Sequence, residues 1–62
     1  MDFRLKIDMD NSAFEDNPGA ELARILRDVA SECRDYVDAP AAYVGCVRDI
    51  NGNDVGEWKI KK

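Results

Sequence analysis

The side chains that could serve as general acids, bases or thiol nucleophiles include thirteen carboxylates and two thiols, and their arrangement does not suit catalysis. Histidine is absent, so no imidazole could activate Cys33 or Cys46 as a nucleophile. The chain also lacks Gly-x-Ser-x-Gly and phosphate-binding glycine motifs. Glu15 and Asp16 are neighbours in a stretch rich in turn formers, where adjacent side chains diverge instead of facing each other across a substrate. The sequence therefore predicts a protein that is not an enzyme.

Metal and cofactor sites are not indicated either. The segment from residue 8 to residue 16 is rich in oxygen ligands, but it lacks the spacing of acids and glycine found in a calcium-binding loop. Two thiols without histidine supply too few ligands for zinc. No apolar run has the length of a signal peptide or a membrane span, so we expect a cytoplasmic protein. Cys33 and Cys46 should then stay reduced and pack as small side chains, with a disulfide as the alternative.

Charge is distributed unevenly along the chain. The net charge is −4, and residues 8 to 38 alone hold nine acids against three arginines, a net −6. Such a protein repels nucleic acid and anionic membranes and is attracted to basic surfaces. The expected partner is a basic, nucleic-acid-binding protein, with no direct contact to nucleic acid or membrane.

One amphipathic helix is predicted from Asn17-Pro18 to about Val37. Asn17 suits the N-cap and Pro18 the first helical position, whereas Asp38-Ala39-Pro40 ends the helix because the residue before a proline avoids helical geometry. Apolar residues recur at helical spacing and should form the face that packs on a sheet. These residues are Leu22, Ile25, Leu26, Val29, Cys33, Tyr36 and Val37.

Acidic side chains of this helix project within an arc about 60° wide beside the apolar face. Only Arg24 lies close enough to pair with them. A partner could bind this row as a set of phosphate-like charges; alternatively, the row is a solvated face that serves solubility. The candidate partner-binding residues are Glu21, Asp28, Glu32 and Asp35, extended from the preceding loop by Asp8, Asp10, Glu15 and Asp16.

Three strands are predicted, one before the helix in the sequence and two after it. Residues 3 to 9 alternate apolar and charged side chains, as a strand with one wet face does. Asn51-Gly52 predicts a two-residue hairpin turn in which both residues have positive φ. This turn sets Tyr43 opposite Ile60, Gly45 opposite Trp58 and Val47 opposite Gly56 on the inner face. The outer face would then hold Val44, Cys46, Arg48, Val55, Glu57 and Lys59.

The predicted fold is α+β, a single domain over residues 1 to 62 with one helix on a three-stranded antiparallel sheet. The order is strand, helix, strand, strand, and the first strand pairs with the last. Phe14 should plug the core from the loop before the helix. Val44 and Val55 give the outer face a small apolar patch, which is compatible with a monomer or a weak homodimer.

Three segments, FRLKIDMDNSAFED, NPGAELARILRDVA and RDINGNDVGEWKI, resemble a family of very small acidic proteins encoded by phages and other mobile elements. The chain is also similar to the small anti-CRISPR proteins that block type I systems. This resemblance implies a DNA mimic that occupies the basic surface of the interference complex where its subunit reads the protospacer-adjacent motif. The alternative is a phage structural or regulatory accessory protein whose acidic face serves only solubility.

Overall fold

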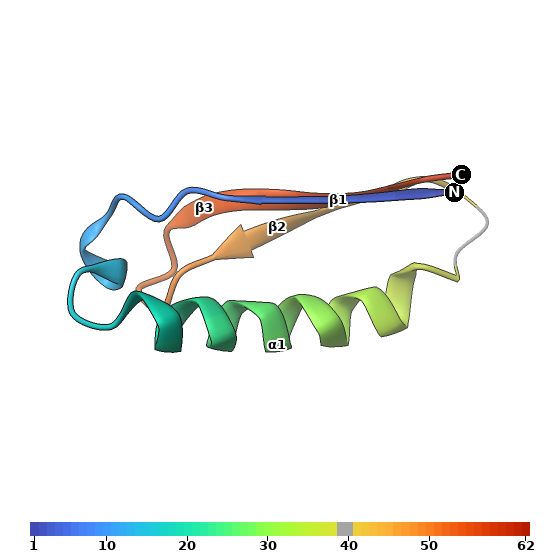
Figure 1. Ribbon diagram of the computed structural model, residues 1–62. Helices are drawn as coiled ribbons and strands as arrows, with labels where there is room; N and C mark the ends of the chain where they lie inside the picture. The colour runs from blue at the N-terminus through green and yellow to red at the C-terminus, as the bar shows by residue number, and fades with distance from the viewer. Residues whose placement is uncertain (39–40) are drawn as a thin grey trace.

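The computed structural model describes residues 1–38 and 41–62, in which a helix covers one face of a three-stranded antiparallel sheet (Figure 1). The sheet order β1-β3-β2 confirms the predicted α+β fold and the pairing of the first strand with the last. The two chain ends lie together at one end of the sheet. The elements are β1 (Asp2–Ile7), a short 3-10 helix η1 (Ser12–Phe14), α1 (Pro18–Tyr36), β2 (Tyr43–Arg48) and β3 (Asp54–Lys61).

The inner pairs of the hairpin have the predicted register. Tyr43 lies opposite Ile60, and Gly45 opposite Trp58. A Cβ added at Gly45 would stand 2.2 Å from the indole nitrogen of Trp58. Glycine is therefore required where the indole crosses β2, because any larger residue would displace the ring from the core.

The hairpin turn differs from the predicted two-residue turn. Only Gly52 has a positive φ, of 82°, and Asn51 does not. The Gly52 N–H donates to the Asp49 carbonyl at 3.0 Å, and the Asp49 N–H donates to the Asn53 carbonyl at 2.9 Å. This is a three-residue loop in which one residue adopts the left-handed conformation, the next most common way to close a hairpin.

A register shift follows from this longer loop. Val47 pairs with Gly56, but Arg48 pairs with Asp54, so Val55 is an extra residue in β3 relative to β2. A bulge of this kind changes the direction of side chains locally. Val55 is buried within the core cluster, so its predicted place on the outer face is wrong.

The helix begins as predicted. The Asn17 side chain accepts a hydrogen bond from the Ala20 N–H at 3.1 Å, and Pro18 is the first helical residue. The helix ends at Tyr36 with Val37 as the C-cap. Ala39 and Pro40, to which the stop was attributed, lie outside the described residues. Within the described residues, no helix is both long and apolar enough to cross a membrane.

The core lies between α1 and the sheet and includes Phe14, as predicted. The helix, however, is rotated relative to the predicted apolar face. Ile25 is 1% exposed, but Leu26 is 43% exposed, whereas Glu21 is buried. The acidic flank therefore turns toward the sheet, and part of the apolar face turns away from it. The buried apolar residues are Phe14, Ile25, Val29, Val47, Val55, Trp58 and Ile60.

Candidate functional site

The eight predicted carboxylates do not form one surface. Asp8 and Asp10 lie beside Asp54 at the start of β3. Glu15 and Asp16 are exposed in the turn before α1. The loop acids are therefore not part of the helix row, of which Glu21, Asp28 and Glu32 lie on the side of α1 that faces β2.

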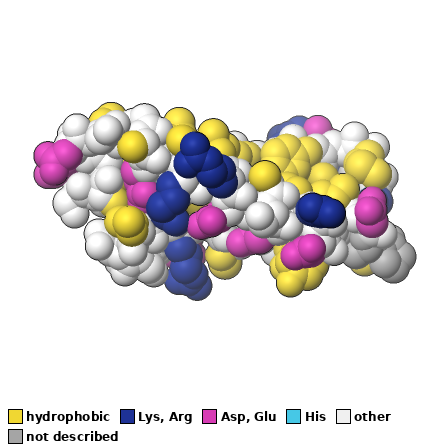
Figure 2. Space-filling model, turned by 90° about the horizontal axis from the view of Figure 1, so that it is seen from below, with side chains coloured by type: hydrophobic (Ala, Val, Ile, Leu, Met, Phe, Trp, Pro, Cys, Tyr) yellow, Lys and Arg dark blue, Asp and Glu magenta, His cyan; other side chains and the backbone are white. Residues whose placement is uncertain are grey.

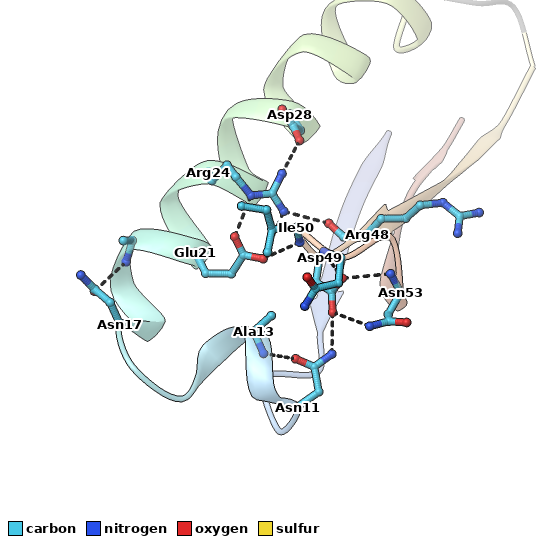
Figure 3. Close-up of polar contacts among 12 residues, drawn as sticks. Asn11, Ala13, Asn17, Glu21, Arg24, Asp28, Arg48, Asp49, Ile50 and Asn53 are labelled. Atoms are coloured by element: carbon cyan, nitrogen blue, oxygen red, sulfur yellow. Dashed lines mark hydrogen bonds and ion pairs between the residues drawn. The ribbon is translucent and has the colours of Figure 1, made fainter.

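Glu21 is a structural anchor. Its carboxylate accepts hydrogen bonds from Arg24 Nε at 2.7 Å and from the Ile50 N–H at 2.8 Å (Figure 3). The side chain is only 7% exposed, and the hydrogen bond from Arg24 lowers the pKa of Glu21 against the opposing effect of burial. The Ile50 N–H lowers this pKa further. Glu21 thus ties the hairpin loop to the first turns of α1 and is not available to a partner.

Arg24 stands at the centre of the same contacts. Its guanidinium also binds the Asp28 carboxylate at 3.0 Å and the Arg48 carbonyl at 3.2 Å. Two of the four helix acids are therefore bridged by one cation (Figure 3). Asp28 nevertheless keeps 65% of its side chain exposed, so it remains open to a partner on its outer side.

Asp49 is a second buried carboxylate, and sequence reasoning missed it. One oxygen accepts from the N–H groups of Asn51 and Asn53, and the other from the side-chain amides of Asn11 and Asn53 (Figure 3). Burial alone would raise the pKa of Asp49, but the hydrogen bonds, first of all from Asn53, outweigh burial and lower it. The signal in the sequence was the spacing Asp49-x-Asn51-x-Asn53, which is typical of a side chain that caps its own turn.

Asn11 extends this hydrogen-bond network from the hairpin turn to the short helix η1. Its amide nitrogen donates to Asp49 at 2.7 Å, and its amide oxygen accepts from the Ala13 N–H at 3.0 Å, which caps η1. The loop before α1 and the hairpin turn are thereby joined through one side chain. This end of the molecule has a structural role, because its buried polar groups are engaged by one another.

Glu32 also has a partner within the chain. Its carboxylate accepts the indole N–H of Trp58 at 2.8 Å, across the backbone of Gly45. The half-buried Glu32 therefore satisfies the one polar atom of a fully buried tryptophan. Asp35, one turn further on, is exposed.

A groove of about 570 Å³ runs between α1 and β2. Its walls include the parallel ring pair Tyr36 and Tyr43, whose centroids lie 4.5 Å apart, and the carboxylates Asp28 and Glu32. Figure 2 views the face that bears the helix, where acidic side chains form a row with Lys and Arg side chains beside it. The groove therefore combines an apolar, aromatic wall with negative charge.

The backbone of β2 is open on the side of this groove. The Asp8 N–H donates to the Val55 carbonyl at 2.7 Å, so alternate residues of β3 from Val55 onward bond to β1 and those between them bond to β2. The backbone groups of Val44 and Cys46 then point to the outer edge. The Arg48 carbonyl points the same way and accepts from Arg24. An extended segment of a partner could pair with this edge.

The thiols lack the environment that makes a cysteine reactive. Burial raises the pKa of Cys33, and the charge of Glu32 adds to this effect. Cys46 is exposed on the outer face of β2. Among residues 1–38 and 41–62, no three Cys, Asp or Glu side chains gather as a metal-binding group.

The groove between α1 and β2 can bind a partner by charge, by aromatic contact and by backbone pairing. Comparison with protein-family models, curated proteins and solved structures yields no significant match.

Proposed function

We propose that this chain is a non-catalytic protein that binds a basic segment of a partner protein in the groove between α1 and β2. The observation that carries the proposal is the juxtaposition of the exposed carboxylate Asp28, the tyrosine pair and the open edge of β2 around one groove. Lys or Arg side chains of a partner would meet negative charge here, and their aliphatic stems would meet the aromatic wall.

The resemblance to small anti-CRISPR proteins suggests a specific partner. In this form of the proposal the chain acts in the cytoplasm of a bacterial host and occupies the DNA-binding surface of a type I interference complex as a DNA mimic. The carboxylates that remain for that contact are Asp28 and Asp35, since Glu21 and Glu32 hold the fold. Asp8, Asp10, Glu15 and Asp16 are exposed in the segment before α1 and could widen the contact.

The second candidate function is a phage structural or regulatory accessory protein whose acids serve solubility. One observation favours it: three of the four helix acids already have hydrogen-bond partners within the chain. The two candidates differ in whether an exposed carboxylate beside the groove matters more than one elsewhere.

A matched pair of charge reversals separates these candidates. Asp35→Lys reverses the charge of an exposed acid one turn beyond Glu32, which lines the groove, and Glu57→Lys makes the same change in charge on an exposed residue of β3. In binding assays with a purified type I interference complex, we expect Asp35→Lys to weaken binding about tenfold or more and Glu57→Lys to change it less than about threefold. Circular dichroism of both variants should match the parent protein.

A second variant tests the strand edge. Val44→Pro removes an N–H that points to solvent without removing a bond to β3, so the fold should persist while pairing with a partner strand is blocked.

A plasmid-protection assay tests the function within a cell that carries an active type I system. The parent protein should protect the plasmid from interference, whereas Asp35→Lys should not. Absence of both binding and protection by the parent protein across several subtypes would favour the accessory function.

A further inference from the structure

The side of the molecule opposite the groove bears apolar groups that α1 does not cover. The helix lies closer to β2 than to β1 (Figure 1), and Phe3 on the inner face of β1 is 45% exposed. Leu26 is exposed on the flank of α1 away from the acids, while Leu5 and Ile7 are partly buried. Figure 2 shows hydrophobic side chains exposed on the helix-bearing face. β1 therefore presents a partly open apolar face.

The outer edge of β1 is also open. No strand among residues 1–38 and 41–62 pairs with that edge. Because Asp8 bonds to Val55, the even-numbered residues of β1 bond to β3, and the N–H and C=O groups of Phe3, Leu5 and Ile7 face outward. Natural edge strands are usually blocked by charged side chains, a bulge, a proline or an inward-facing charge. Of these, β1 has only charged side chains on its outer face, and they are of both signs. β1 has a regular register with β3, contains no proline and points Phe3, Leu5 and Ile7 inward.

We propose that β1 pairs antiparallel with β1 of a second copy of this chain, which forms a two-fold symmetric homodimer with a continuous six-stranded sheet. With Arg4 on the symmetry axis, Asp2 of each copy lies opposite Lys6 of the other. On the inner face Phe3 lies opposite Leu5, and Met1 opposite Ile7. This register uses every outward backbone group of β1 and matches charge with charge and apolar side chain with apolar side chain.

Two neighbouring registers also bring the outward backbone groups of the two copies together, but each is less favourable than the register centred on Arg4. A shift that centres the axis on Leu5 sets Asp2 opposite Asp8 and Arg4 opposite Lys6, which opposes like charges at every outer position. A shift that centres the axis on Phe3 leaves the outward backbone groups of Ile7 unpaired. In the proposed register the two Arg4 side chains meet at the axis, and each already binds Asp2 of its own chain at 2.9 Å, which offsets the like charge.

This dimer is independent of the proposed partner groove, because it uses the opposite edge of the sheet. Its test is sedimentation equilibrium of the whole chain with charge-reversed variants. Asp2 and Lys6 are exposed, so Asp2→Lys and Lys6→Asp should leave the circular-dichroism spectrum unchanged. We expect the parent chain to dimerise with a Kd below about 1 mM. Each single reversal opposes like charges twice per dimer and should weaken dimerisation about tenfold.

Two further samples restore opposite charges at positions 2 and 6 across the proposed interface. The double variant Asp2→Lys/Lys6→Asp should regain part of the dimerisation, since it restores opposite charges across the interface but removes the Asp2 that binds Arg4. An equimolar mixture of the two single variants should form a heterodimer more readily than either variant forms a homodimer. In a mixture of isotope-labelled and unlabelled parent chains, a filtered nuclear Overhauser effect should join the Arg4 Hα atoms of the two copies. A parent chain that stays monomeric at about 1 mM overturns the proposal. A dimer whose Kd is the same in the parent chain and in both single variants also overturns the proposal.

Discussion

The two edges of the sheet differ in what α1 places beside them. Next to β2 stand carboxylates and the ring of Tyr36, which line a groove together with that strand. Next to β1 stands the apolar flank of the helix, with Leu26 exposed. A helix whose apolar positions alone set its rotation would bury Leu26 and expose Glu21, which is the reverse of what is seen.

Polar anchors account for this difference. Glu21 binds the backbone of the hairpin loop, and Glu32 binds the indole of Trp58. Both anchors lie on the same flank of α1 and draw it toward β2, because an unpaired indole N–H or backbone N–H in the interior would be costly. A few buried hydrogen bonds can therefore rotate a helix away from the position favoured by its hydrophobic pattern.

The largest expected effect contrasts two adjacent residues of α1. Ile25→Ala should lower the free energy of unfolding by about 3 kcal/mol, because Ile25 is 1% exposed and its loss leaves a cavity. Leu26→Ala should cost less than about 1 kcal/mol in dilute protein, because much of that side chain is already in water. Urea unfolding followed by Trp58 fluorescence measures both. Equal losses would show that the helix is not rotated as described.

A smaller effect is expected at the anchor of the hairpin loop. Glu21→Ala should lower Tm by roughly 10 °C, since it removes the acceptor for Ile50 and leaves Arg24 without its buried partner. Glu21→Gln retains an acceptor and should lower Tm less. Asp28→Ala removes only the exposed contact of the same arginine, and thermal unfolding should detect a change within about 3 °C. If Asp28→Ala were as damaging as Glu21→Ala, the distinction between anchor and exposed acid would fail.

Much of the fold follows from local pattern. The alternation in β1, the Asn17-Pro18 start of α1 and the match of Gly45 to Trp58 each depend on neighbours or on a pairing register, and the structure confirms them. Phe14 was predictable because it is an isolated aromatic in a polar loop, and such a side chain gains most by burial.

The remaining features depend on contacts between distant residues. The turn lengthens because Asp49 captures the N–H groups of Asn51 and Asn53, which competes with the two-residue turn that Asn-Gly favours. The roles of Glu21 and Glu32 depend on partners 29 and 26 residues away, which a helical projection does not contain. The projection therefore identified the acidic flank but not which of its carboxylates would be buried.

The smallest expected effect is a decrease in the free energy of unfolding as the pH falls into the acid range. The pKa values of Glu21 and Asp49 are lowered in the folded chain, so the unfolded chain binds more protons in acid. The stability that they contribute is fully present above about pH 4, the range of unperturbed carboxyls, and is lost as the pH falls through the folded values. Urea midpoints measured from pH 6 to about pH 2 should fall, and should fall less in Glu21→Gln. A parallel decline in both proteins would assign the acid sensitivity to other carboxyls.

The most direct test of the helix rotation is the titration of Glu21 itself. Carbon-detected nuclear magnetic resonance of the side-chain carboxyl, followed through acid pH, reports its pKa without recourse to unfolding. We predict a pKa below the ordinary glutamate value, because Arg24 and the Ile50 N–H stabilise the charged form. A pKa at the ordinary value would place Glu21 in solvent, and a pKa above it would mean burial without these hydrogen bonds; either result would contradict the account.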